Sequence, residues 1–130
     1  MQIDRPDVVV AVSACFERYE TALVTNDVAT LGALFRNDPR TLRYGIAENL
    51  YGYDEIQAFR SARAPFGLER TREKTVITTY GTDFAVASTL FYRASLVGKV
   101  GRQMQTWVRF PDGWFIVAAH VSVIANQDGA

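Results

Sequence analysis

The two halves of the chain follow different hydrophobic patterns, and this contrast limits the fold more than any other feature. In the first half, apolar residues recur every three to four positions, as at Val8, Val12, Phe16 and Leu23. That spacing predicts a helix with one buried face. In the second half, β-branched and aromatic residues dominate, which is typical of strands. The contrast predicts an α+β fold in which helices are segregated from a sheet.

Turn and capping residues divide the first half into shorter elements. After the first helix, Asn26 or Asp27 caps a short second helix, and Pro65 stops a third helix that begins near residue 53. Between the second and third helices, TLRYG (41–45) predicts a short strand, and ENLYG (48–52) predicts a turn or a brief partner strand. We therefore expect three helices with one short strand inserted among them.

The second half predicts strands that are joined by tight turns. Four strand-like segments cover residues 72–81, 83–95, 99–110 and 113–124. The sequence Pro-Asp-Gly before the last segment is a strong hairpin signal. Because links this short force successive strands to run antiparallel, we expect a curled antiparallel sheet. No linker or repeat divides the chain, so residues 1–130 are expected to form a single domain.

Composition excludes several classes of function. The 14 basic residues balance the 14 acidic residues, which argues against binding to nucleic acid or to a membrane surface. The apolar patch near the N-terminus is too short to span a bilayer and lacks the features of a signal peptide. Cys15 is the only cysteine, which fits a reducing compartment, so we expect a cytoplasmic protein. With one histidine and no cysteine cluster, we expect no metal site.

Two ordered sets of motifs, RYG…ENLYG…FR and QTWVR…GW…AAHVS, extend over most of the chain. With these motifs, the sequence resembles the DUF3225 branch of the nuclear-transport-factor-2-like (SnoaL-like) superfamily. This is the branch of AtzH and HpxZ, which act in cyanuric acid and oxalurate catabolism. The resemblance implies a cone-shaped α+β fold, in which three N-terminal helices pack against a curled antiparallel sheet and leave a pocket.

The resemblance also implies a function in nitrogen catabolism. It implies a cofactor-free hydrolase that converts 1,3-dicarboxyurea, or a similar carboxylated urea or amide, to allophanate by decarboxylating amide hydrolysis. It further implies a possible amidase-signature partner, and a homodimer or higher homo-oligomer that forms through the sheet face. Two alternatives remain: a non-catalytic accessory subunit of such an amidase, or a related enzyme that acts on oxalurate-type substrates. Under the enzyme interpretation, the resemblance gives catalytic roles to Tyr19 in FERYE and Arg43 in LRYG.

The residues themselves allow a structural interpretation beside the catalytic one. Tyr19 lies on the apolar stripe of the first helix, where it is either a core tyrosine or a proton donor in a pocket. Arg43 pairs either with Glu48 or with a substrate carboxylate, which a guanidinium binds through two parallel hydrogen bonds. Strand alternation puts Thr41 and Arg43 on one face but does not identify the inward face.

Four further residues are predicted to bind substrate. Because a second carboxylate requires a second cation, Arg60 is preferred over Arg63 on the third helix, although both also suit a solvated face. The other three are Tyr44 beside Arg43, His120 and Trp107. His120 is either a pocket residue or a structural histidine, and Trp107 suits a pocket wall better than a chemical role.

Overall fold

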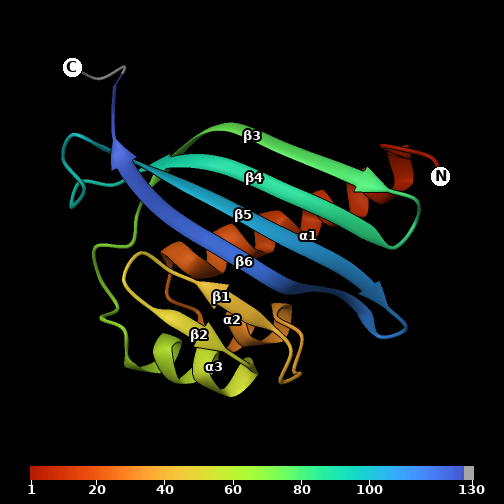
Figure 1. The fold of residues 1–130 in the computed structure, drawn as a ribbon, viewed down its shortest axis with the longest axis horizontal. Coiled ribbons are helices and arrows are strands. Elements are labelled where there is room, and N and C mark those ends of the chain that lie inside the picture. The colour runs from red at the N-terminus through yellow and green to blue at the C-terminus, as the bar shows by residue number, and fades with distance from the viewer. Residues whose placement is uncertain (128–130) are drawn as a thin grey trace.

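Six strands form one sheet in the computed structural model, which describes residues 1–127 (Figure 1). The helices are α1 (Pro6–Val24), α2 (Val28–Leu34) and α3 (Tyr53–Ala62). The strands are β1 (Leu42–Tyr44), β2 (Asn49–Tyr51), β3 (Thr71–Tyr80), β4 (Phe84–Tyr92), β5 (Lys99–Phe110) and β6 (Gly113–Ala125). This arrangement confirms the α+β class, the three helices and the four long strands.

The four long strands pair antiparallel as predicted, but the sheet as a whole is mixed, so the prediction of an antiparallel sheet does not hold for all six strands. The strand order is β2-β1-β6-β5-β4-β3, and β1 pairs with β6 in parallel, with Leu42 opposite Ala118 and Tyr44 opposite His120. All the other pairs of neighbouring strands are antiparallel. Short links force an antiparallel arrangement only on strands that are consecutive in the chain. β1 and β6 are far apart in sequence, so no such link constrains their relative direction. ENLYG does form a partner strand, which is β2.

Helix α1 packs its apolar stripe against the inner face of the long strands (Figure 1). Val12 and Phe16 are among its fully buried residues, and they meet Trp107 and Ile116 from β5 and β6 in one core. Helices α2 and α3 lie beside the short strands β1 and β2. Within residues 1–127, no helix is both long and apolar enough to cross a membrane.

An irregularity in β6 reverses its alternation between the two faces of the sheet. Trp107 pairs with Ile116, whereas Thr106 pairs with Ala118, so the register shifts between these two pairs. An extra residue in one strand reverses the inside and outside positions that follow it. Ile116 and Ala119 therefore both lie in the core, and His120 is exposed on the outer face. Simple alternation, which groups His120 with Trp114, fails here because Trp114 packs against the core.

Candidate functional site

Arginine side chains line a cavity of about 130 Å³ at one end of the sheet. Arg43 comes from β1, Arg63 follows α3, Arg70 precedes β3, and Arg93 follows β4. The cavity is smaller than the roughly 300–1,000 Å³ of pockets for drug-sized ligands. Among residues 1–127, Glu48 is the one acidic residue in the wall. The cavity therefore favours a small anion.

Tyr19, from α1, is one of the residues that line this cavity. Tyr19 is only 1% exposed, and the buried Arg60 donates a hydrogen bond from Nη2 to its hydroxyl oxygen over 2.9 Å. Because a guanidinium has only donors, Tyr19 must be the acceptor in this bond. Within residues 1–127, no group accepts the Tyr19 proton in return. That proton is therefore available to a ligand in the cavity.

The charges around Tyr19 make its hydroxyl more acidic. Burial on its own raises the pKa of Tyr19, because it disfavours the charged form. The guanidinium groups of Arg60, Arg43 and Arg70, together with the hydrogen bond from Arg60, outweigh burial and hold the pKa below its usual value. Tyr19 can thus donate a proton more readily than an ordinary tyrosine, and the tyrosinate left behind is stabilised by the same cations.

Arg43 pairs with an internal acid and also lines the cavity. Its Nη1 donates to Oε1 of Glu48 over 2.9 Å, while its Nε is buried and has no partner. Burial, followed by the nearby charge of Arg60, lowers the pKa of Arg43. Phe59 lies beneath its guanidinium, 5.3 Å from the ring centroid. The ion pair with Glu48 therefore orients Arg43 but leaves part of its hydrogen-bonding capacity unused.

The glycine of the RYG motif is required by this ion pair. A Cβ atom on Gly45 would overlap the Glu48 carboxylate and crowd Nη1 of Arg43. Because the Glu48 carboxylate is the end of a flexible side chain, we expect it to swing away in a Gly45→Ala variant. Arg43, whose side chain is only 7% exposed, would then lose its partner. The expected cost is about 1–3 kcal/mol in the free energy of unfolding, measured by urea denaturation.

A double-mutant cycle tests this explanation of Gly45. Glu48→Gln removes the same ion pair without adding volume at position 45. If both substitutions act on one interaction, their costs will be less than additive in the double variant. Additive costs would contradict the account and would point to independent backbone strain at Gly45.

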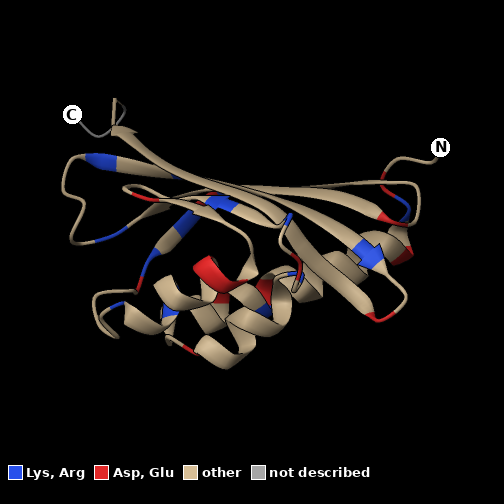
Figure 2. Ribbon diagram, turned by 60° about the horizontal axis from the view of Figure 1, so that its bottom comes forward, with Lys and Arg blue, Asp and Glu red and all other residues tan. Residues whose placement is uncertain are grey.

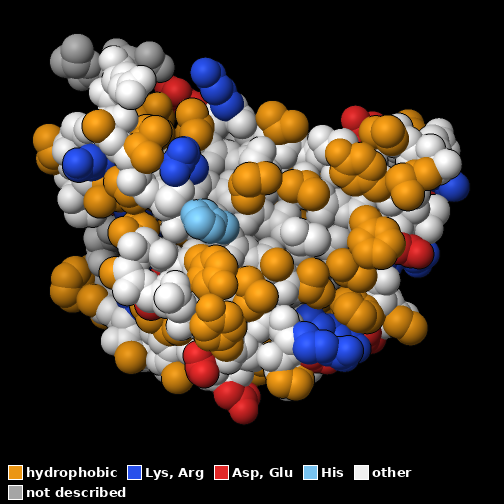
Figure 3. All heavy atoms as spheres, viewed as in Figure 1, with side chains coloured by type: hydrophobic (Ala, Val, Ile, Leu, Met, Phe, Trp, Pro, Cys, Tyr) orange, Lys and Arg blue, Asp and Glu red, His pale blue; other side chains and the backbone are white. Residues whose placement is uncertain are grey.

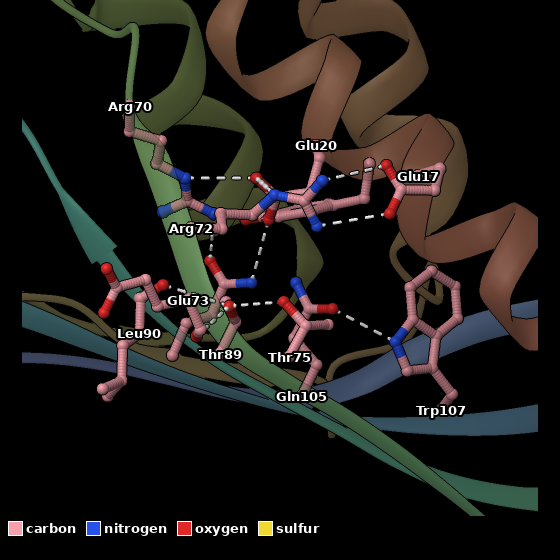
Figure 4. Close-up of polar contacts among 12 residues, drawn as sticks. Glu17, Glu20, Arg70, Arg72, Glu73, Thr75, Thr89, Leu90, Gln105 and Trp107 are labelled. Carbon is pink, nitrogen blue, oxygen red and sulfur yellow. Dashed lines mark hydrogen bonds and ion pairs between the residues drawn. The ribbon is translucent and has the colours of Figure 1, made fainter.

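Arg70 is fully engaged by a second acid, Glu20 (Figure 4). Its Nε and Nη2 both donate to the Glu20 carboxylate, and Nη2 also donates to Oε1 of Gln103 over 2.9 Å. Arg72, which lies on β3, pairs with Glu17 at 3.0 Å. Acidic positions on α1 thus lie beside basic positions at the start of β3 (Figure 2). The charge of Arg70 is therefore largely compensated within the protein.

Arg63 and Arg93 are less well compensated than Arg70. Within residues 1–127, neither side chain forms an ion pair, and Nε of each is buried without a hydrogen-bond partner. Burial, followed by the charges of nearby arginines, lowers the pKa of Arg63 to about 10. The pKa of Arg93 is lowered by the same two causes, with Arg70 as the main neighbouring charge. The cavity therefore carries an excess of positive charge.

The structure brings only Tyr19 and Arg43 of the six predicted site residues to the cavity wall. Arg60 lies behind Tyr19, and Arg63, the alternative on the same helix, lines the cavity instead. The reason is local: α3 ends at Ala62, and Arg63 has extended backbone angles, so it leaves the helical face that it was expected to share with Arg60. Arg60 thus contacts the tyrosine rather than the cavity.

Tyr44, His120 and Trp107 do not line the arginine cavity. Tyr44 and His120 lie in a shallow groove on the outer face of the sheet, with their ring centroids 6.3 Å apart. Trp107 is fully buried in the core, where its Nε1 donates to Oε1 of Gln105 over 3.1 Å. These three residues therefore lie apart from Tyr19 and Arg43, and their role in substrate binding stays a prediction.

Three residues that shape the cavity have no part in the sequence-based prediction. Glu20 is a buried acid four positions after Phe16, on the apolar face of α1, and a charge in such a stripe is the signal that could have revealed it. Arg70 and Arg93 follow no periodic pattern, because each stands just outside a strand.

In residues 1–127, no group of three or more histidine, cysteine, aspartate or glutamate side chains is arranged to hold a metal ion.

Comparison with known proteins gives matches over nearly the whole chain. A DUF3225 protein of unknown function from Pectobacterium atrosepticum SCRI1043 is 58% identical, with 95% of each chain covered and a TM-score of 0.92. A cystatin-like fold protein from Burkholderia xenovorans LB400 is 50% identical, with 98% of this chain and 99% of that chain covered and a TM-score of 0.93. No protein with a curated description matches the sequence.

A more distant neighbour shares the fold alone. A ketosteroid isomerase-like protein from Erwinia carotovora atroseptica SCRI1043 is 15% identical, with 94% of this chain and all of that chain covered, and superposes with a TM-score of 0.73. The family model that describes AtzH-like proteins, by contrast, matches residues 1–127. This protein therefore belongs to the AtzH-like family and has a nuclear-transport-factor-2-like fold.

Proposed function

We propose that this protein is a cofactor-free enzyme that converts 1,3-dicarboxyurea, or a closely similar carboxylated urea, to allophanate. The observation that carries the proposal is the meeting of Tyr19 and Arg43 in one small cavity with an excess of positive charge. A cavity of this kind suits a small, carboxylate-bearing ligand, because guanidinium groups bind carboxylates strongly in sites that exclude water. Membership of the AtzH-like family agrees with this substrate class.

In the proposed reaction, Arg43 holds one substrate carboxylate while Tyr19 supplies a proton. The bond between a urea nitrogen and its terminal carboxyl carbon breaks, and the electron pair stays on the nitrogen. The nitrogen takes the proton of Tyr19, and the carboxyl group leaves as carbon dioxide. Water later returns a proton to the tyrosinate, and the hydroxide that this leaves combines with the carbon dioxide to give bicarbonate. Arg60, which already donates to Tyr19, stabilises the tyrosinate between these steps.

A direct assay tests the proposal. The purified protein is supplied with 1,3-dicarboxyurea that an amidase produces in place, and allophanate is measured. Formation of allophanate well above the rate without the protein supports the enzyme. A rate no higher than that of the spontaneous reaction would contradict it. Parallel assays with oxalurate separate this substrate from the oxalurate-type alternative.

The pH dependence of turnover follows from the role of Tyr19 as an acid. Only protonated tyrosine can donate, so kcat/KM should fall as pH rises through the pKa of Tyr19, which lies below the ordinary value of about 10. Arg60→Gln removes the nearest cation and should move this fall to higher pH, while its amide still fills part of the space. A pH profile with the same alkaline limit in both proteins would contradict the role of Arg60.

A non-catalytic accessory function is the second candidate, and the outer face of the sheet favours it. Apolar side chains gather there around the histidine (Figure 3), and Val76, Phe84 and Met104 are each more than half exposed. Such a face suits a second copy of the chain or a partner such as an amidase. Under this alternative, the chain co-purifies with the amidase but forms no allophanate alone.

A further inference from the structure

Each cation of the cavity wall falls into one of two groups. Arg43 and Arg70 have carboxylate partners in the protein, Glu48 and Glu20 respectively. Arg63 and Arg93 have none among residues 1–127, although both line the same cavity. Each of these half-buried arginines is also repelled by the charges of neighbouring arginines, which is unfavourable. An anion that enters the cavity would offset this repulsion.

The unused donors of these two arginines also describe the missing partner. Nε and Nη2 of Arg63 and Nε of Arg93 are buried without an acceptor. A guanidinium presents such donors in a fork that matches the two oxygens of a carboxylate. The ring of Phe91 supports Arg93 from below, with its centroid 5.3 Å from the guanidinium carbon. This contact restrains the Arg93 guanidinium before any ligand arrives.

We propose that Arg63 and Arg93 form a second carboxylate subsite, so that the cavity selects small dicarboxylates over monocarboxylates. The inference rests on the proposed function only in taking Arg43 as the anchor of the first carboxylate. It has a consequence for turnover, because loss of carbon dioxide turns a dianionic substrate into a monoanionic product. The product cannot occupy both subsites and leaves more easily than the substrate.

Binding of inert acids tests this subsite without any turnover. Malonate serves as the dicarboxylate probe and acetate as the monocarboxylate control, at matched ionic strength, with affinities measured by calorimetry. We expect malonate to bind more tightly than acetate. Arg63→Gln and Arg93→Gln should each weaken malonate binding by about tenfold to a hundredfold, the range for a lost charge-assisted hydrogen bond, with little effect on acetate. Equal affinity for the two acids would overturn the proposal.

Two further variants distinguish the loss of a particular cavity arginine from a general loss of positive charge, with malonate affinity as the measurement. Arg102→Gln removes an exposed arginine whose side chain bonds to Ser122 on the outer face, and it should leave malonate affinity unchanged. Arg63→Lys keeps the charge but loses the fork, so an intermediate affinity is expected. Equal weakening by Arg102→Gln and Arg93→Gln would mean that malonate responds only to net charge, which overturns the subsite.

The proposed function and the subsite can fail separately. If malonate binds as expected but the protein forms no allophanate, the subsite stands and the proposed substrate is wrong. If allophanate forms normally in Arg63→Gln and Arg93→Gln and malonate affinity is unchanged, the enzyme stands and the subsite is wrong. Melting temperatures measured without ligand confirm that each variant is folded, since removing an unpaired cation is expected to leave the fold intact.

Discussion

Replacing Tyr19 with phenylalanine should lower the turnover of 1,3-dicarboxyurea by about 10²–10⁴-fold, the usual contribution of a positioned acid. The hydroxyl group is the one proton donor that the cavity offers from α1, and its proton has no acceptor among residues 1–127. Phenylalanine keeps the ring that packs against Phe35, so the core should change little. The measurement is kcat/KM for allophanate formation, with circular dichroism to confirm the fold.

A second tyrosine provides the matched control for this substitution. Tyr53 lies at the start of α3 and donates its hydroxyl hydrogen to the carbonyl oxygen of Gly32 over 3.0 Å, away from the cavity wall. Tyr53→Phe should reduce stability modestly, by about 1 kcal/mol for one lost hydrogen bond, and leave turnover unchanged. If Tyr19→Phe retains full turnover, Tyr19 is a core residue and the proposed proton transfer is wrong.

Replacing Arg43 with methionine should lower turnover by about 10²–10³-fold, the usual effect of removing one charge-stabilising donor from an active site. Methionine approximates the length of the arginine stem and leaves the contact with Phe59 apolar. The effect should appear in KM, because Arg43 is proposed to hold the carboxylate in the ground state, and also in kcat, because this contact is proposed to strengthen in the transition state. Steady-state kinetics over a range of substrate concentrations separates the two parameters.

The control for Arg43 is an arginine with a similar ion pair on the surface. Arg109 pairs with Asp83 at 2.9 Å and lies outside the cavity. Arg109→Met should leave turnover unchanged and alter stability by less than about 1 kcal/mol, as is usual for an exposed pair. Restored turnover in an Arg43→Lys variant would show that charge alone is sufficient. Unchanged turnover in Arg43→Met would remove the central anchor of the proposed mechanism.

Local sequence patterns predict the elements of this fold well. The apolar spacing of α1 identifies its buried face, including Tyr19, and Asp27 caps α2 as expected through a hydrogen bond from the backbone of Thr30 over 3.1 Å. These features depend on residues only a few positions apart, so the sequence contains them directly. Asp4 precedes α1 and is a residue type that often caps helices, but its carboxylate accepts instead from the backbone of Thr79 on β3 over 3.0 Å.

Alternation alone could not show which face of each strand points toward the core and the cavity. Alternation correctly separates Arg43 from Tyr44, but only the packing of β1 beside β6 turns Arg43 toward the cavity and Tyr44 toward the outer groove. The register shift in β6 then moves His120 outward. A parallel pairing between distant strands and an irregularity within a hairpin leave no periodic signal, because both depend on contacts across the sheet.

By itself, the sequence determined the order of helices and strands, the buried stripe of α1, and the positions of Tyr19 and Arg43 as candidates. Only the tertiary structure decided which arginines share the cavity and which of them are compensated by acids. Arg63, Arg70 and Arg93 stand at the ends of three different elements, and nothing in their local sequence relates one to another. Their charges converge because the sheet curls over α1, and this convergence is a property of packing rather than of any segment.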